Sequence, residues 1–224
     1  MKKFMALLLV AGMTLSLTAC GGSTDTAKTD QADGKDTFTV GFDQDFPPFG
    51  YVGDDGEFTG FDIEMATECA ARMGKKIVLQ PIDWDAKDME LEAGTIDCIW
   101  NGFTMNGRED QYTWTDPYMD NSQVVVVKKD SGINTLADLA GKVVEVQKES
   151  AAETALNDEE HADLMASFAQ LLSVGEYNTA FMDLESGAVD AVAIDIGVAQ
   201  FQIEGKEDQY QILDETISSE QYAV

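Results

Sequence analysis

The chain has 224 residues, with 14 Lys or Arg against 42 Asp or Glu and a formal net charge of −28 at pH 7. This surplus of negative charge excludes nucleic acid as a partner, because it repels phosphate backbones. The three cysteines and the single histidine form no CxxC motif and show no metal-ligand spacing, so we expect neither a metal site nor a cofactor. The acidic surface needs no further function, since a solvated charged surface keeps a protein soluble.

The N-terminal residues have the pattern of an export signal. Two lysines precede an apolar run at residues 4–17, which is shorter than the roughly 20 residues of a membrane-spanning helix. Residues 17–20, Leu-Thr-Ala-Cys, resemble the lipobox of bacterial lipoproteins. This resemblance implies that residues 1–19 are a cleaved signal peptide and that Cys20 is lipidated. The protein would then be extracytoplasmic and anchored to the cell membrane.

Residues 20–35 carry no large apolar side chain after the cysteine, so they cannot bury enough surface to order themselves. They are predicted to form a flexible tether between the lipid anchor and the folded part. The rest of the chain, residues 36–224, is long enough for one large domain or for two lobes with a core each.

Strand-like runs alternate with helical patterns over residues 36–120, which predicts an α/β lobe with a mostly parallel sheet. In chain order, the expected elements are a strand at 37–42, a helix at 61–73, a strand at 77–79, a helix at 85–93 and a strand at 96–100. Gly74 and Gly94 follow the two helices and are typical C-terminal stop residues.

Two cysteines fall in this lobe. Cys69 lies in the apolar stripe of the first helix, and Cys98 lies in the third strand. The favoured interpretation is two small buried side chains, and a disulfide between them is the alternative.

A second α/β pattern over residues 121–217 predicts a second lobe of similar size. The expected elements are strands at 123–127, 142–147 and 188–194, and helices near 136–139, from Ser150, at 178–185 and at 198–203. Two such lobes place a cleft between the C-terminal ends of their strands, where small ligands bind. We expect hinges near residues 118–123 and 218–222, with residues 218–224 as the second hinge strand.

Five motifs resemble those of the bacterial extracellular solute-binding proteins for polar amino acids, which are substrate-binding lipoproteins of ABC transporters. They are DFPPF at 45–49, GFDIEMA at 60–66, NGFTMNGR at 101–108, AGKV at 140–143 and AID at 193–195. The resemblance implies a periplasmic-binding-protein-like α/β fold with two lobes. It also implies a monomer that captures a polar or cationic amino acid and delivers it to an ABC transporter permease.

Relatives usually continue past a position such as Tyr222 and return to the first lobe. The resemblance therefore implies that the sequence is truncated and that this return to the first lobe is missing.

A free amino acid carries a carboxylate and an ammonium, and each needs a partner in a closed cleft. Arg108 is able to hold a carboxylate through two parallel hydrogen bonds, a geometry that lysine does not reproduce. The resemblance implies that Asn101, Gly102 and Thr104 share this carboxylate-binding loop. Gly102 would add a backbone N–H and Thr104 a hydroxyl. The alternative for Arg108 is a surface ion pair with one of the two acidic residues that follow it.

Ser150 and Ala151 are expected to begin a helix directly after a strand. Their N–H groups would then point at the same carboxylate from the positive end of the helix. Relatives commonly have a glycine and two hydroxyl residues where this chain has Glu149, Ser150 and Ala151, so Ala151 would contribute only its backbone. Asp195 follows an apolar strand and resembles the family residue that holds the ligand ammonium. The alternative role for Asp195 is an N-cap, and the two roles are compatible.

The side-chain pocket is expected to consist of Phe46 and Trp84, whose rings would enclose the aliphatic or cationic part of the ligand. Asp43 has two equally favoured interpretations. In relatives that take lysine or arginine, an acid at this place faces the distal cation of the ligand, and an aspartate is also a common turn residue.

The expected mechanism is hinge closure, in which the ligand binds one lobe and then gains contacts to the other. No catalytic residue is expected. Two alternatives are kept open, because a fold does not fix a function. One is an enzyme similar to cyclohexadienyl or arogenate dehydratases, for which Glu149 is the only acid or base candidate. The other is a binding module that feeds a sensor.

Overall fold

The computed structural model describes residues 36–224. The predicted signal peptide, Cys20 and the predicted tether lie outside the described residues. Within the described part, no helix has the length and apolar character needed to cross a membrane. The same residues contain no group of three or more His, Cys, Asp or Glu side chains able to hold a metal ion.

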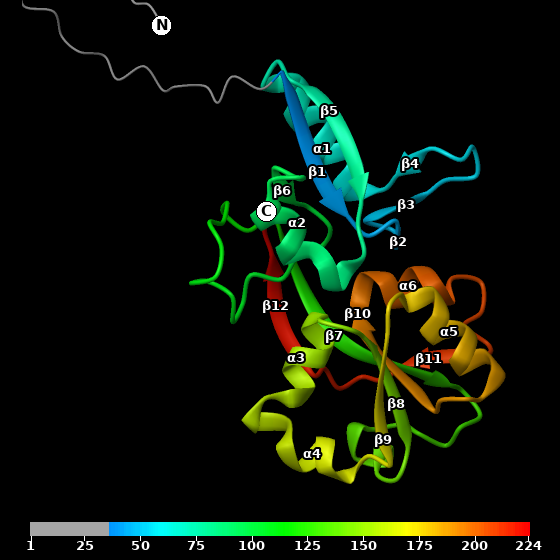
Figure 1. The fold of residues 1–224 in the computed structure, drawn as a ribbon. Helices are drawn as coiled ribbons and strands as arrows, with labels where there is room; N and C mark the ends of the chain where they lie inside the picture. The colour runs from blue at the N-terminus through cyan, green and yellow to red at the C-terminus, as the bar shows by residue number, and fades with distance from the viewer. Residues whose placement is uncertain (1–35) are drawn as a thin grey trace, which may run out of the picture. The chain divides into compact units, whose positions relative to one another are not determined.

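The first lobe contains a parallel sheet in the order β5-β1-β6 (Figure 1). Its strands are β1 (Thr37–Phe42), β5 (Lys76–Pro81) and β6 (Cys98–Ile99). Helix α1 (Phe61–Arg72) precedes β5, and the 3₁₀ helix η1 (Trp84–Ala86) and helix α2 (Lys87–Ala93) connect β5 to β6. Gly94 ends α2 in the left-handed conformation, as the sequence predicts.

Between β1 and α1 the chain forms a small antiparallel sheet that the sequence did not predict. Its strands are β2 (Asp45–Phe46), β3 (Gly50–Val52) and β4 (Phe58–Thr59). After β4, Gly60 sets the start of α1, because a Cβ at this position would lie 2.3 Å from the carbonyl oxygen of Phe49. This close approach brings Asp62 into the interior, where it is 0% exposed.

The second lobe contains a mixed sheet in the order β11-β7-β10-β8-β9, with β12 paired to β7. The strands are β7 (Met119–Lys128), β8 (Val143–Gln147), β9 (Gln170–Val174), β10 (Ala191–Asp195), β11 (Tyr210–Ile212) and β12 (Ser218–Tyr222). The helices are η2 (Leu136–Leu139), α3 (Ala151–Asn157), η3 (Glu159–His161), α4 (Ala162–Ser167), α5 (Tyr177–Ser186) and α6 (Ile196–Ile203).

The core of the second lobe lies on both faces of this sheet. Val124 and Val126 of β7 pack with residues of α5 and α6, whereas Val125 and Val127 pack with residues of α3. The alternation follows from the two-residue period of a strand. It explains why the run of valines is apolar at every position, since both faces of β7 are covered.

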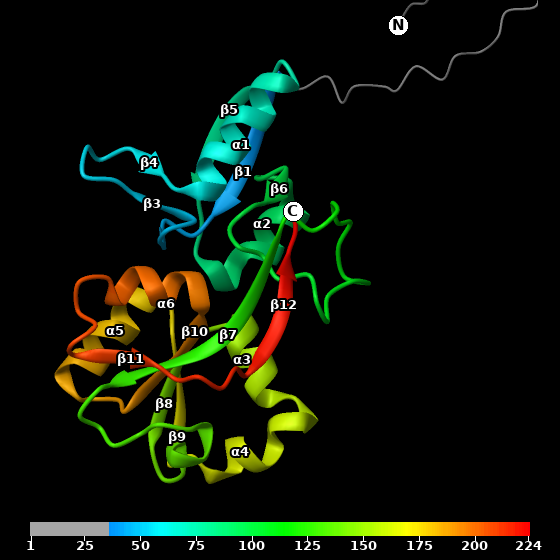
Figure 2. The same ribbon diagram turned by 180° about the vertical axis from the view of Figure 1, so that it is seen from behind.

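Two strands run antiparallel where the chain passes between the lobes. Residues 119–123 of β7 pair with residues 218–222 of β12, and the rest of β7 belongs to the second sheet. Figure 2 shows the two strands side by side. Beyond β12, the N–H of Ala223 donates to the carbonyl of Phe103, and the carbonyl of Val224 accepts from the N–H of Thr115. The last residues therefore contact the first lobe.

The expected α/β fold with two lobes is confirmed by this topology and by the solved structures described below. The second sheet is less parallel than expected, because β7 is antiparallel to β10, β11 and β12. An apolar run does not reveal strand direction, so the sequence could not show this. The lobe boundaries at residues 120 and 217 stay predictions.

Cys69 and Cys98 are free thiols, and both are half-buried against one apolar cluster of the first lobe. Burial raises the pKa of the Cys98 thiol to about 12. The structure thus contains the two packed thiols of the favoured interpretation and no disulfide between them.

Candidate functional site

A cavity lies between the lobes, and eleven residues line it. Ten of these are the residues predicted to bind a ligand: Asp43, Phe46, Trp84, Asn101, Gly102, Thr104, Arg108, Ser150, Ala151 and Asp195. The eleventh, Gln147, was not predicted. The free space of the cavity is about 20 Å³, enough for about one water molecule, so the lobes would have to separate before an amino acid could enter.

Arg108 is half-buried at this cavity. Its Nη1 donates to the carbonyl oxygen of Thr104 at 3.1 Å, and its Nη2 donates to the carbonyl oxygen of Glu149 at 3.4 Å. Among the described residues it forms no ion pair, so the expected alternative of a surface pair with a following acid is absent. Its remaining N–H groups are free to bind a carboxylate.

Asp62 fixes the loop that carries Gly102. Oδ2 of Asp62 accepts the N–H of Gly102 at 2.6 Å and the hydroxyl of Tyr118 at 2.9 Å, and burial raises the pKa of Asp62 to about 7. Gly102 has a left-handed φ of 58°, and a Cβ there would lie 3.0 Å from the Phe46 ring. The geometry corrects the expectation that Gly102 offers its N–H to a ligand, because this N–H is donated to Asp62.

Thr104 and Asn101 complete the first-lobe loop. The hydroxyl of Thr104 donates to Oε1 of Glu220 at 2.7 Å, so its proton is directed toward β12 and not to a ligand. Oδ1 of Asn101 accepts the backbone N–H of Asp43. Nδ2 of Asn101 is buried and has no hydrogen-bond partner among the described residues. This amide nitrogen is therefore an unpaired side-chain donor beside the cavity.

Asp195 ends β10 and is 4% exposed. Its Oδ1 accepts hydrogen bonds from Asn121 Nδ2 at 2.7 Å, Gln123 Nε2 at 2.7 Å and the Tyr222 hydroxyl at 2.6 Å. The same two amide nitrogens donate to Oε1 of Glu220, each at 2.7 Å. Asp195 occupies the N-cap position of α6 but makes no side-chain capping bond there, so the N-cap alternative is wrong.

Asp195 and Glu220 form a buried pair of carboxylates that only neutral donors hold. None of the ion pairs among the described residues gives either acid a cation. Burial, and then the charge of Glu220, raise the pKa of Asp195 to about 7, although the three hydrogen bonds act in the opposite direction. A cation that entered the cavity beside Asp195 would offset this cost, because it would compensate a buried negative charge.

Asp43 is 5% exposed, and its carboxylate accepts two hydrogen bonds. Oδ1 accepts the backbone N–H of Asp45 at 2.8 Å, which is a turn contact, and Oδ2 accepts Nε2 of Gln147 at 2.7 Å from the second lobe. Gln147 Nε2 also donates to the carbonyl oxygen of Gly175 at 2.9 Å. Burial raises the pKa of Asp43 to about 6. The turn role is present, and a role toward a ligand cation stays a prediction.

Phe46 and Trp84 form apolar walls of the cavity. Phe46 packs against Phe49 with ring centres 5.7 Å apart and against Tyr177 at 6.1 Å. Trp84 begins η1 just after β5, and its ring meets that of Phe103 edge to face at 5.5 Å. Because both rings are packed on other aromatic rings, they present rigid surfaces to a ligand.

Ser150 caps helix α3. Its Oγ accepts the N–H of Glu153 at 3.1 Å, and its own N–H is donated to the carbonyl oxygen of Gln147 at 3.2 Å. This corrects the expectation that the Ser150 N–H points at a ligand carboxylate. The N–H of Ala151 has no acceptor among the described residues, and Ala151 lines the cavity.

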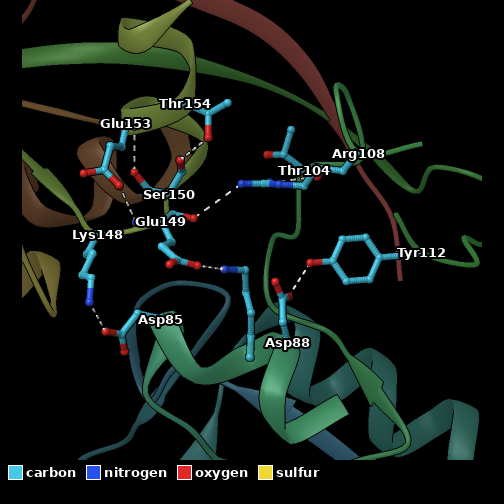
Figure 3. A network of polar contacts seen from close by, with 11 residues as sticks. Asp85, Asp88, Thr104, Arg108, Tyr112, Lys148, Glu149, Ser150, Glu153 and Thr154 are labelled. Atoms are coloured by element: carbon cyan, nitrogen blue, oxygen red, sulfur yellow. Dashed lines mark hydrogen bonds and ion pairs between the residues drawn. The ribbon is translucent and has the colours of Figure 1, made fainter. Parts of the chain in front are cut away.

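Two ion pairs join the lobes beside the cavity (Figure 3). Lys87 Nζ lies 3.2 Å from Glu149 Oε2, and Lys148 Nζ lies 2.6 Å from Asp85 Oδ2. We call these four residues the lip. In each pair one residue comes from η1 or α2 of the first lobe and the other from the segment between β8 and α3.

The fold and this site define a class. A two-lobed α/β protein with a small cavity between its lobes, where a guanidinium and buried carboxylates meet, has the architecture of the periplasmic binding proteins. The chain belongs to the bacterial extracellular solute-binding proteins, family 3, whose model matches residues 38–180.

Relatives of known ligand support this assignment. The chain is 36% identical to the arginine-binding extracellular protein ArtP of Bacillus subtilis over 66% of its residues and 56% of ArtP, so it spans little more than half of that relative. It is 30% identical to the L-cystine-binding protein TcyJ of Escherichia coli over 98% of its residues and 80% of TcyJ. An ABC uptake transporter substrate-binding protein of Streptococcus pneumoniae with bound histidine has a TM-score of 0.79 and 34% identity. That alignment covers 84% of this chain and 78% of the other.

Several residues of the site had no sequence signal strong enough to predict them. Gln147 is the last residue of an apolar strand, where an amide is easily taken for a surface residue. The network around Asp195 is drawn from the hinge strands, namely Asn121, Gln123, Glu220 and Tyr222. The alternation of polar residues in β7 and β12 was the available signal, but it becomes informative only once the two strands are paired.

Proposed function

We propose that this protein captures a free polar or cationic amino acid outside the cytoplasmic membrane by closure of its two lobes and delivers it to an ABC transporter permease. One observation carries the proposal: Arg108 and Asp195 line the same small cavity. Arg108 has free N–H donors, and Asp195 has no cation beside it. An amino acid supplies both missing partners, because its carboxylate suits the guanidinium and its ammonium suits the aspartate. The ligands named for the relatives, arginine, cystine and histidine, agree with this chemistry.

The test is thermal unfolding of the purified protein with each of the twenty amino acids, ornithine and cystine. We expect one or a few of them to raise the unfolding midpoint, because a ligand that binds only the folded state stabilises it. Arg108→Ala and Asp195→Ala should abolish the shift. No shift with any amino acid in a well-folded sample would overturn the proposal, and prephenate and arogenate turnover would then test the dehydratase alternative.

The side chain of the ligand is expected to lie between Phe46 and Trp84, with Asp43 selecting for a cation. Asp43→Asn tests this selection, because it removes the charge and keeps the shape. If the ligand is arginine, lysine or ornithine, we expect affinity to fall about tenfold, whereas a neutral ligand should bind about equally well. Equal loss for neutral and cationic ligands would show that Asp43 acts only as a turn residue.

We further propose that Cys20 carries the lipid anchor, that residues 20–35 are the tether and that the protein acts as a monomer. Two acyl chains hold a protein stably on a bilayer. Metabolic labelling with a palmitate analogue should modify the wild-type protein and not Cys20→Ser, and the variant should be released into the medium or periplasm. Retention of unlabelled Cys20→Ser in the membrane fraction would contradict the anchor.

A further inference from the structure

Glu149 has a strained backbone at the edge of the cavity. Its φ is 57°, and it is the single non-glycine residue with a left-handed φ among residues 36–224. Residues with a Cβ adopt this conformation at a cost, and it persists where surrounding contacts hold it. Such strain often marks a functional position, so the contacts of Glu149 indicate what the conformation serves.

Three contacts hold Glu149, and two of them reach the first lobe (Figure 3). Its backbone N–H donates to Oε2 of Glu153 at 2.6 Å, within the second lobe. Its carboxylate meets Nζ of Lys87 at 3.2 Å, and its carbonyl oxygen accepts from Nη2 of Arg108 at 3.4 Å. The left-handed turn thus directs the carbonyl and the side chain of one residue to two different cations across the cleft.

Lys87 has little freedom to find another partner in this arrangement. Its side chain is 3% exposed, and its ammonium lies 5.4 Å from the centre of the Trp84 ring, which lines the cavity. The Glu149 side chain, at 49% exposure, approaches it from the solvent side. The ion pair therefore covers the Trp84 wall of the cavity, and separation of the lobes would break it.

We propose that Glu149 is a positioning residue that latches the lobes together: its carboxylate pairs with Lys87 to favour the closed state, and its carbonyl orients the Arg108 guanidinium in that state. The latch needs no ligand. Only the second part, the orientation of Arg108 toward a carboxylate, rests on the proposed amino-acid binding.

Glycine and glutamine at position 149 separate the strain from the charge. Both variants remove the carboxylate, so we expect the ratio of closed to open protein without ligand to fall about fivefold in each. Only Glu149→Gly relieves the left-handed strain, so its unfolding midpoint should lie above that of Glu149→Gln. A lower midpoint in Glu149→Gly than in Glu149→Gln would show that the backbone of Glu149 is not strained.

The closed fraction is measured by ¹⁹F NMR of protein labelled with 5-fluorotryptophan, in which the Trp84 signal is assigned by its loss in Trp84→Phe. Lys87→Met should reduce the closed signal as much as Glu149→Gln, and the double variant should add nothing further, because both changes break one contact. The matched control is Lys142→Met, which removes a Lys–Asp190 pair inside the second lobe at 3.7 Å. It should leave the Trp84 signals unchanged.

An unchanged closed fraction in Glu149→Gly, or additive effects of Glu149→Gln and Lys87→Met, would overturn the latch. The orienting role is tested by calorimetry with L-arginine, L-histidine and L-cystine as probes. For a probe that binds, Glu149→Gly keeps the carbonyl in the left-handed conformation, whereas the β-branched side chain of Glu149→Val disfavours that conformation and turns the carbonyl away. Glu149→Val should therefore bind about tenfold more weakly than Glu149→Gly. Equal affinity of the two variants would overturn the orienting role. If none of the twenty amino acids, ornithine or cystine binds, the proposed function fails, whereas the NMR result still decides the latch.

Discussion

The two charged parts of the cavity are built in different ways. Asp195 is held by neutral donors, and Asn121, Gln123 and Tyr222 come from the paired strands β7 and β12. Arg108 is held by two carbonyl groups, of which that of Glu149 belongs to the opposite lobe. We call the part of the site around Asp195 the hinge side and the part around Arg108 and Glu149 the lip side. The hinge side is preformed wherever β7 and β12 stay paired, whereas the lip side is completed only when the lobes meet.

Under the proposed function, this difference would let an amino acid drive closure. Its ammonium would bind where a buried negative charge already lacks a cation, so the hinge side would gain free energy at once. Its carboxylate would gain its full set of contacts only after Arg108 meets the second lobe. The ligand would then shift the equilibrium toward the closed state by the free energy of these added contacts.

The largest expected effect comes from removal of the guanidinium. Arg108→Ala should weaken amino-acid binding at least about 100-fold, or about 3 kcal/mol, because a buried carboxylate would lose its charged partner. Arg108→Lys should recover little, since an ammonium does not form the same two parallel bonds. Calorimetry measures both affinities. The unfolding free energy should change by less than about 1 kcal/mol, because the guanidinium makes only two bonds to carbonyls.

Recovery of near wild-type affinity in Arg108→Lys would show that Arg108 acts as a simple positive charge. The contrast between the two sides of the cavity would then fail, because Arg108, like Asp195, would act through its charge alone.

Asp195→Asn should separate binding from stability. We expect affinity to fall about 30-fold, because the ammonium loses its anion, while the unfolding free energy at pH 8 rises by about 1 kcal/mol. The rise follows because the variant removes one of two neighbouring buried carboxylates. Urea unfolding measures the stability.

Glu145→Gln is the matched control, since Glu145 is 1% exposed on β8 and does not line the cavity. It should raise stability and leave binding unchanged. A loss of stability in Asp195→Asn at pH 8 would mean that the hydrogen-bond network needs the carboxylate. It would also mean that the two neighbouring carboxylates, Asp195 and Glu220, do not destabilise the fold when both are ionised.

The pH dependence of the unliganded protein follows from the same buried acids. Burial raises the pKa of Asp43 to about 6 and the pKa values of Asp62 and Asp195 to about 7. In the unfolded chain these acids titrate near 3.8. The folded state therefore binds more protons between pH 4 and 7, so the contribution of these acids to stability falls as pH rises through that window.

We expect urea unfolding to show a loss of at least about 2 kcal/mol between pH 4.5 and 7.5, and Asp195→Asn to reduce the slope. Amino-acid affinity should change in the opposite direction, because the ammonium binds the ionised carboxylate. Parallel changes of stability and affinity with pH would contradict the assignment of Asp43 and Asp195 to the ligand side of the cavity.

The sequence predicted the components of the site better than their contacts. Ten of the eleven lining residues, Arg108 and Asp195 among them, were predicted because each suits a part of an amino acid or resembles a family motif. The use of each polar atom was not predictable, since the Gly102 N–H and the Thr104 hydroxyl are taken by Asp62 and Glu220, which are distant in the chain. Such pairings depend on tertiary packing and on the register of β7 and β12, which local pattern does not encode.

The smallest expected effect is at the outer pair of the lip. Lys148 and Asp85 lie 2.6 Å apart, but their side chains are 54% and 39% exposed, so water screens their attraction. Lys148→Met should lower the closed fraction by less than about twofold, and 0.5 M salt should remove most of this difference. In the inner pair, Lys87–Glu149, the Lys87 side chain is buried at 3% exposure, so the effect of this pair on the closed fraction should persist in the same salt. An equal response of the two pairs to salt in the Trp84 signal would mean that burial of Lys87 does not protect the Lys87–Glu149 pair. The four residues of the lip would then act only as surface charges, and Glu149 would not be a latch.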